Sequence, residues 1–297
     1  MRAVHTALEP GLRSRAQFAF RQLRQRWRAL SSRPGTSAAP LLGHPPGPPA
    51  PLLDALPDAQ LEELNAILPW NSFVVDGRGR RFGNVPWHGK GRAAEKIPNK
   101  RTRQMHDAFD LRGRTVLEIG CFEGAHTLGL CLLGAQVTAI DSRVENVVKT
   151  IVRTACFDHH PRVFVCDVER RPLPAEQLRA EYCHHVGVFY HLADPVTHLL
   201  ELGTVISRGI LLDTHYATDG EAAERYDVGG ESFAYRRYGE FGYGDVWSGM
   251  FDHSKWLTLD TLLQLLTRAG FDRVLSVATR DGSQGARAAI LAERSGR

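Results

Sequence analysis

The sequence predicts an α/β fold in which a mostly parallel sheet carries helices on both faces. Short apolar runs and helical runs alternate from residue 115 to residue 215, and a glycine-punctuated turn follows the first run. A leucine-rich helix and two further apolar runs follow near the end of the chain. Because alternation of this kind favours right-handed crossovers between parallel strands, we expect ligands to collect where those strands end.

Length and composition are those of a soluble globular protein. The 297 residues suffice for one large domain with appendages, and 43% of them are apolar and 24% charged. No stretch approaches the roughly 18 to 20 consecutive apolar residues that a membrane-spanning helix needs. The five cysteines lack C-x-x-C spacing, which indicates reduced thiols in a cytoplasmic protein rather than a disulfide framework or a zinc site.

Charge and composition divide the chain into three parts. Residues 1–53 hold eight arginines and one acid, a net charge of +7, so the overall +4 leaves −3 for the remainder. We predict a basic, Pro-rich, disordered extension and linker over 1–51, an N-terminal cap over 52–110 and a catalytic domain over 111–297. The first 30 residues fit either a solvated extension or a basic amphipathic helix that contacts a membrane surface, nucleic acid or a partner.

Each element has its own local signal. In the cap, 58–68 has helical spacing, and 73–82 contains two short strands around a glycine turn. Apolar runs then predict strands at 115–120, 136–141, 162–168, 184–190 and 209–215, with helices at 125–133, 146–155 and 195–206. A further helix lies at 258–270, followed by strands at 271–278 and 287–292. Residues 217–256, rich in aromatics and glycine, fit either a lid over the strand ends or a β-hairpin with ordinary aromatic packing.

The turn after the first strand combines two glycines, a bulky side chain and two acids. Gly120 and Gly124 punctuate the turn, but Phe122 occupies the place of the middle glycine of a dinucleotide fingerprint, which argues against a bound pyrophosphate. Asp141, at the end of the second strand, suits ribose hydroxyls, and Glu118, beside the turn, can receive an ammonium group. These ligand groups occur together in S-adenosylmethionine.

This pattern resembles the first two motifs of class I S-adenosylmethionine-dependent methyltransferases. It reads Glu118-x-Gly120-x-x-x-Gly124 followed by Asp141, and Cys166-Asp167-Val168 matches the position at which that family contacts adenine. The segment His185-Val-Gly-Val-Phe-Tyr-His-Leu-Ala-Asp-Pro195 is similar to the branch that includes the bacterial tRNA uridine carboxymethyltransferase. The resemblance covers roughly residues 85–293.

The resemblance implies both a fold and a cofactor. The fold is a Rossmann-like, seven-stranded, mostly parallel sheet of order 3-2-1-4-5-7-6, in which the last two strands form an antiparallel pair. The cofactor is S-adenosylmethionine, and the residues expected to bind it are Glu118, Gly120, Cys121, Phe122, Gly124, Asp141, Ser142, Asp167, Val168, Gly187 and Tyr190.

Catalysis of methyl transfer requires alignment of the nucleophile, exclusion of water and, for a hydroxyl acceptor, a base. His191, after the fourth strand, is our first choice as base, and Asp213 and His215, at the end of the fifth, are next. Each histidine also fits a purely structural role. Asp213 and His215 could instead combine with Asp252 and His253 in a divalent-metal site, but two such pairs are a weak metal signal, so we predict no metal.

A basic segment precedes the first strand. Residues 77–103 contain nine lysines and arginines against one acid, interleaved with aromatic residues. In the resembling branch the segment before the first strand closes over the cofactor or substrate, so Trp87, Lys96, Lys100 and Arg101 are our candidates for binding a phosphate or carboxylate of the acceptor. A solvated charged loop is the alternative.

These features together predict a methyltransferase that uses S-adenosylmethionine and modifies oxygen on a small molecule or carbohydrate. The fourth strand suggests a tRNA-modifying (carboxy)methyltransferase as the alternative. Against nucleic acid, the chain after residue 103 is acidic overall, whereas a tRNA partner demands an extended basic surface. A catalytically silent protein that binds the cofactor is the non-enzymatic alternative.

Overall fold

The computed structural model describes residues 41–83, 93–282 and 284–296. The basic segment 1–30 and Trp87, both singled out in the sequence, lie outside the described residues. Within the described part of the chain, no helix has the length and apolarity needed to cross a bilayer.

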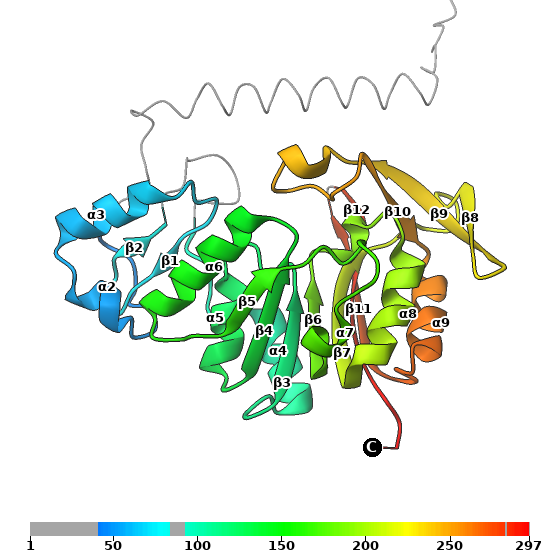
Figure 1. Cartoon of the computed structure of the whole chain (residues 1–297), viewed down its shortest axis with the longest axis horizontal. Helices are drawn as coiled ribbons and strands as arrows, with labels where there is room; N and C mark the ends of the chain where they lie inside the picture. The colour runs from blue at the N-terminus through cyan, green and yellow to red at the C-terminus, as the bar shows by residue number, and fades with distance from the viewer. Residues whose placement is uncertain (1–40, 84–92, 283, 297) are drawn as a thin grey trace, which may run out of the picture.

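A seven-stranded sheet forms the centre of the molecule (Figure 1). Its order, β5-β4-β3-β6-β7-β12-β11, confirms the predicted order 3-2-1-4-5-7-6. The pairings from β5 to β7 are parallel, whereas β12 is antiparallel to both of its neighbours. The strands are β3 (Thr115–Ile119), β4 (Gln136–Asp141), β5 (Arg162–Val165), β6 (Ala180–Val186), β7 (Ile206–His215), β11 (Arg273–Gly282) and β12 (Gly285–Glu293).

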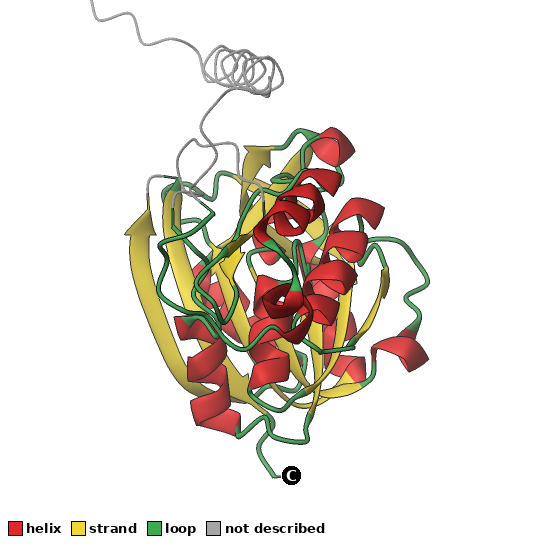
Figure 2. Ribbon diagram, turned by 90° about the vertical axis from the view of Figure 1, so that its left-hand side faces the viewer, coloured by secondary structure: helices red, strands yellow, loops and turns green. Residues whose placement is uncertain are grey.

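Helices cover both faces of this sheet, as the edge-on arrangement in Figure 2 shows. On one face, Met105 and Phe109 pack on Val116 and Leu211. On the other face, the leucines of two late helices pack on alternate residues of the same strands. Strands buried on both faces explain why the sequence shows nearly continuous apolar runs. The helices are α4 (Lys100–Phe109), α5 (Ala125–Leu132), α6 (Val144–Cys156), α7 (Ala175–Leu178), α8 (Pro195–Val205) and α9 (Leu259–Arg268).

The N-terminal elements pack on α5 and α6 through a separate apolar cluster that includes Leu53, Trp70, Leu128 and Cys156. Residues 41–50, which composition assigned to the linker, also belong here: Arg81 N donates to Leu41 O at 2.8 Å, and the segment lies beside the turn between the two short strands. Backbone hydrogen bonds hold this Pro- and Gly-rich segment, and composition does not reveal them. The elements are α2 (Pro51–Ala55), α3 (Asp58–Ile67), β1 (Val74–Val75) and β2 (Arg81–Phe82).

The insertion after β7 forms a three-stranded antiparallel sheet of order β10-β9-β8, made of β8 (Glu224–Val228), β9 (Glu231–Gly239) and β10 (His253–Leu257). It therefore contains the β-hairpin that the aromatic pattern allowed, extended by a third strand. In Figure 1 it lies beyond the upper end of the central sheet, in yellow and orange. The loop 240–252 joins β9 to β10.

Several predicted elements differ from the structure, among them the third strand, which ends at Val165 rather than at residue 168. The fourth strand ends at Val186 rather than near residue 190, because Gly187 adopts a φ of +84° and the chain then forms the 3₁₀ turn η2 (Phe189–His191). Residues 100–109, for which no helix was predicted, form α4, since Asn99 caps it by accepting from Thr102 N at 3.0 Å. The many basic residues of α4 concealed its apolar spacing.

Candidate active site at the strand ends

The glycine turn lies against two other elements so closely that side chains are excluded. Gly120 has a φ of +75°, and a Cβ there would lie 2.1 Å from Val188 Cγ2. Gly124 has a φ of +76°, and a Cβ there would lie 2.9 Å from Thr150 Cα on α6. Both glycines are therefore required by backbone conformation and by space.

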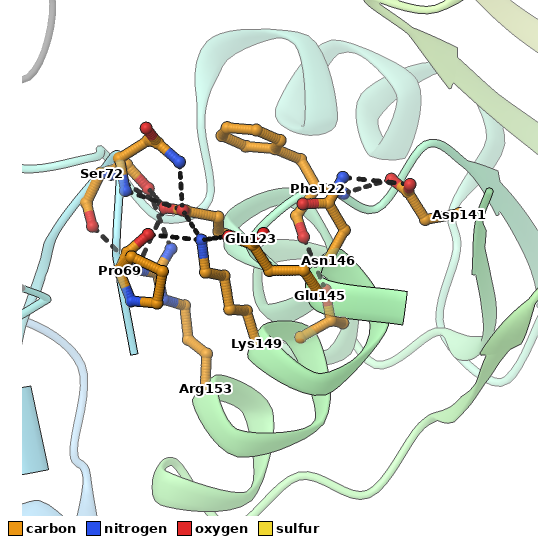
Figure 3. Close-up of polar contacts among 11 residues, drawn as sticks. Pro69, Ser72, Phe122, Glu123, Asp141, Glu145, Asn146, Lys149 and Arg153 are labelled. Carbon is orange, nitrogen blue, oxygen red and sulfur yellow. Dashed lines mark hydrogen bonds and ion pairs between the residues drawn. The ribbon is translucent and has the colours of Figure 1, made fainter. Parts of the chain in front are cut away.

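Asp141 lies next to this turn and organises it (Figure 3). Its Oδ1 accepts from Arg143 N at 2.9 Å and Asn146 Nδ2 at 3.0 Å, and its Oδ2 accepts from Phe122 N at 3.1 Å. Burial raises the pKa of Asp141 despite these donors. A carboxylate oxygen accepts about two hydrogen bonds, so Oδ2 retains one acceptor position for a ligand hydroxyl.

Glu118 is a buried carboxyl with one unsatisfied oxygen. Its Oε2 accepts from Thr127 Oγ1 at 2.6 Å, but Oε1 has no partner among the described residues. Burial raises the pKa of Glu118 to about 8. His126 and His184 lie beside it, with ligand atoms of the three residues within 4.8 Å of one another. A buried acceptor of this kind costs stability unless a donor or a cation occupies the adjoining space.

Asp213 is fully buried and lies at the centre of an arginine cluster formed by Arg101, Arg280 and Arg287. Arg101 Nε lies 2.6 Å from Oδ2 and Arg280 Nη2 lies 3.2 Å from it, while Arg287 Nε contacts Oδ1. Arg280 Nη2 is also within reach of Oδ1, so both oxygens are occupied. The structure therefore favours the histidines over Asp213 as bases. Three guanidinium groups against one carboxylate leave two excess positive charges at the strand ends.

His191 follows β6 and contacts the insertion. Its Nδ1 lies 2.9 Å from Oε1 of Glu240, a buried residue just after β9. The Tyr190 ring lies beside it, with ring centroids 4.2 Å apart, and the Arg287 guanidinium lies 5.1 Å from the Tyr190 centroid. The predicted base therefore lies between the insertion and the arginine cluster.

His215 is held in an aromatic stack. Its Nδ1 donates to Ala286 O at 3.1 Å, its ring stacks on Trp256 with centroids 4.8 Å apart, and burial lowers its pKa. The alternative metal site is not assembled among the described residues, because Asp213 is surrounded by arginines while Asp252 pairs with its neighbour His253 at 2.7 Å.

Of the other predicted cofactor residues, two are largely buried. Cys121 and Val168 are 2% and 7% exposed. Asp167 accepts from Glu169 N at 3.0 Å, Ser142 is half-buried beside Asp141, and a Cβ at Gly187 would be 4.0 Å from Tyr190 Oη. Of the predicted acceptor residues, Arg101 reaches the site, whereas Lys96 and Lys100 are exposed.

Glu123 is a functional candidate that the sequence analysis missed. Its carboxylate, 1% exposed, accepts from the backbone nitrogens of Asn71 and Ser72 at 2.7 and 2.8 Å, and Lys149 Nζ lies 3.0 Å away (Figure 3). Arg153 of α6 completes the group, with Nη2 3.9 Å from the carboxylate. Glu123 therefore ties the glycine turn to the N-terminal segment and to α6.

Other missed residues come from distant parts of the chain. Pairing of β12 with β7 places Arg287 opposite His215, and pairing of β11 with β12 places Arg280 opposite Arg287. The predicted strand order, with its adjacent fifth, seventh and sixth strands, could have drawn attention to these two arginines. Glu240 gave no comparable signal, because it is 49 residues from His191 and lies in a loop.

Comparison with known proteins gives similarities in both sequence and fold. Residues 117–212 match the family model of the methyltransferase domain. The N-terminal domain of EvdMO1, whose crystals contained S-adenosylhomocysteine and D-fucose, shares the fold with a TM-score of 0.60 and 24% identity over 80% of this chain and 94% of that domain. The family match over residues 117–212 and the shared fold therefore indicate a domain that is similar to methyltransferases.

The chain is also similar to several curated proteins that share one name. It is 29% identical to the tRNA U34 carboxymethyltransferase of Marinobacter nauticus over 72% of this chain and 59% of that protein. The protein of the same name from Methylococcus capsulatus is 32% identical over 54% of this chain and 47% of its own length. The chain thus spans about half the length of the curated relatives that it matches.

Proposed function

We propose that the protein transfers a methyl group from S-adenosylmethionine to an oxygen atom of a small-molecule or carbohydrate acceptor. The observation that carries the proposal is the unsatisfied Oε1 of Glu118, which is buried beside the Gly120 turn and near Asp141. The ammonium group of the cofactor supplies the missing donor and a positive charge. Asp141 Oδ2 then has the remaining capacity for a ribose hydroxyl.

The rest of the crevice suits the same ligand. Phe122 adopts a φ of +49°, and its ring packs on Trp247 of the insertion with centroids 4.7 Å apart. This packing leaves no backbone approach for a pyrophosphate, in contrast to a dinucleotide site. Asp167 and Val168, after β5, are on the side where the adenine would lie.

Protein groups around β6 and β7 align the acceptor and take its proton. When bound, S-adenosylmethionine supplies an electrophilic methyl group on a sulfonium sulfur. With the cofactor bound, His191 would accept the proton of the acceptor hydroxyl as the methyl group is transferred from sulfur to the acceptor oxygen. The products are the methylated acceptor, S-adenosylhomocysteine and a proton on His191. A base in this position typically contributes about 10²- to 10⁴-fold in rate.

Isothermal titration with S-adenosylmethionine tests cofactor binding. We expect saturable binding to the wild-type protein and a loss of at least about tenfold in affinity for Glu118→Gln and Asp141→Asn, since each removes a charged acceptor. Glu176→Gln, which alters an exposed carboxylate paired with Arg179, is the matched control and should bind normally. Binding of NAD⁺ in preference to S-adenosylmethionine would overturn the proposal.

A transfer assay tests the acceptor class. The methyl-labelled cofactor is incubated with sets of hydroxylated small molecules and sugars and, separately, with unmodified tRNA. Label in a small molecule or sugar supports the proposal. Label in tRNA alone would replace the proposed acceptor with nucleic acid, and cofactor binding without turnover on any set would favour the silent binding protein.

The arginine cluster around Asp213 favours carboxymethyl transfer as a second candidate function. Its two excess positive charges lie beside Tyr190, close to where the transferred group would be. A carboxylate on that group would be stabilised by guanidinium groups, which suit planar, bidentate recognition. The similar proteins named tRNA U34 carboxymethyltransferase point in the same direction.

Competition between the two cofactors distinguishes the candidates. If the cluster serves a carboxylate, carboxy-S-adenosylmethionine binds the wild-type protein more tightly than S-adenosylmethionine does, and Arg287→Gln removes that preference. Equal binding of both cofactors, or tighter binding of S-adenosylmethionine, would exclude carboxymethyl transfer and leave methyl transfer in place.

A further inference from the structure

We propose that Glu240 is a positioning residue that fixes His191 in the one neutral tautomer able to act as a base, so that the insertion completes the catalytic site. The inference rests on the role of His191 in the proposed function. It concerns a residue in the loop 240–252, far from the glycine turn in sequence.

The Glu240 carboxylate has four donors for its two oxygens. His191 Nδ1 and Ser254 Oγ each lie 2.9 Å from Oε1, while Ser248 Oγ at 2.6 Å and Gly249 N at 3.1 Å contact Oε2. The side chain is only 2% exposed. Burial favours the neutral acid, but hydrogen bonds from His191, Ser248 and Gly249 lower the pKa of Glu240 below its usual value.

This arrangement determines the proton position on His191. An ionised carboxylate only accepts hydrogen bonds, so His191 Nδ1 must carry the hydrogen that it shares with Glu240. In the neutral ring, Nε2 is then unprotonated and can take a proton from an acceptor hydroxyl. Carboxylates orient catalytic and metal-bound imidazoles in the same way in other proteins.

The contact also fixes the ring in space. A Cβ at Gly249 would lie 2.3 Å from His191 O, so the insertion loop passes directly over the backbone of the 3₁₀ turn. Arg143, beside Asp141, donates to Gly242 O and Asp245 O at 3.0 Å, which secures the same loop over the glycine turn. The loop therefore contacts both the proposed base and the proposed ribose site.

Glu240→Gln gives a sharp test, because the amide has only one acceptor. The Gly249 N–H can only donate a hydrogen bond, so the Gln oxygen, which is the acceptor of the amide, must take the Oε2 position. The amide NH₂ then faces His191 Nδ1, which must become an acceptor, and the hydrogen moves to Nε2. We expect kcat to fall by about 10²- to 10⁴-fold, as for wrong-tautomer variants of other imidazole bases, with S-adenosylmethionine affinity unchanged.

Nitrogen-15 NMR of the histidine rings reads the tautomer without any acceptor, and the spectrum of His191→Gln identifies the His191 signals. Protonated Nδ1 in the wild type and protonated Nε2 in Glu240→Gln support the proposal. Protonated Nε2 in the wild type overturns it, whether or not the variant folds.

Activity separates this inference from the proposed function. Glu224→Gln, in which an exposed carboxylate of the same insertion loses its charge, is the matched control and should keep its rate. If His191→Gln abolishes transfer but Glu240→Gln does not, the positioning role is wrong and the base stands. If His191→Gln retains transfer, the base assignment fails as well. If no acceptor is found, the NMR result still decides the tautomer.

Discussion

Burial sets the protonation state of the residues at the proposed cofactor site. It raises the pKa of Glu118 to about 8 and lowers that of His126 to about 4. At neutral pH the unliganded site therefore contains a protonated carboxyl beside a neutral imidazole. A cationic ligand must displace the proton from Glu118, which couples cofactor binding to pH.

Cofactor affinity should rise with pH up to about 8, where the Glu118 carboxyl loses its proton in the unliganded protein. As the pH rises towards about 8, the apparent Kd for S-adenosylmethionine falls by up to about tenfold per pH unit, and at higher pH it rises again because the ammonium group of the ligand loses its own proton near pH ~8. Titration calorimetry from pH 6 to 9, in buffers of different ionisation enthalpy, measures both the affinity and the released proton. A wild-type pH profile identical to that of Glu118→Gln would contradict this coupling.

At the scale of elements, a buried histidine pair joins β6 to α8. His185 Nε2 and His198 Nε2 lie 2.9 Å apart, and both side chains are fully buried. Burial lowers the pKa of both rings, that of His198 to about 3, so one neutral imidazole donates to the other. Protonation of both rings would place two positive charges in contact inside the core.

The pair should make the protein less stable in acid. The pKa of each ring is lower in the folded protein than its value of about 6.5 in the unfolded chain. The free energy of unfolding is therefore highest above about pH 6.5 and decreases as the pH falls. Each histidine contributes up to about 1.4 kcal/mol per pH unit to the free energy of unfolding. Urea unfolding at pH 7, 6 and 5 should show a shallower pH dependence for the double variant His185→Leu, His198→Leu. If the free energy of unfolding depends on pH equally in the wild type and in the double variant, the histidine pair is not a source of the acid sensitivity.

The elements also show what the sequence can predict. Apolar runs located the central strands, whereas the order of the seven strands, which the family resemblance implied, is confirmed by the structure. The end of β6 was misplaced because the positive φ of Gly187 ends it, and α4 was missed because arginines and lysines dilute its apolar face. The same limit applies to the site. Glu118 and Asp141 could be predicted because they lie at the ends of strands, whereas Glu240 contacts His191 only through the tertiary fold.

At the scale of the whole molecule, Glu123 connects the N-terminal segment to the methyltransferase core. It accepts from Asn71 and Ser72 on one side and pairs with Lys149 on the other, and all of its contacts are buried or partly buried (Figure 3). Its position between Phe122 and Gly124 means that the same carboxylate supports the cofactor turn. Glu123 therefore links docking of the N-terminal segment to the conformation of the proposed cofactor turn, in addition to the apolar cluster.

Glu123→Gln should lower the free energy of unfolding by about 3 kcal/mol, because it removes the carboxylate that pairs with the buried Arg153 and with Lys149, which keeps only the half-exposed Glu145. S-adenosylmethionine affinity should fall as well. Glu176→Gln, which breaks the exposed pair with Arg179, is the control and should leave the free energy of unfolding almost unchanged. Urea unfolding with titration calorimetry measures both effects, and similar losses in the two variants would refute the linking role.

The central claim is that the ends of β3 and β4 bind a sulfonium nucleoside through Glu118 and Asp141. A crystal structure of the full chain with S-adenosylhomocysteine tests it most directly. We predict the amino group of the ligand within hydrogen-bond distance of Glu118 Oε1 and a ribose hydroxyl on Asp141 Oδ2. A ligand bound elsewhere, with Glu118 Oε1 still unsatisfied, would contradict the account.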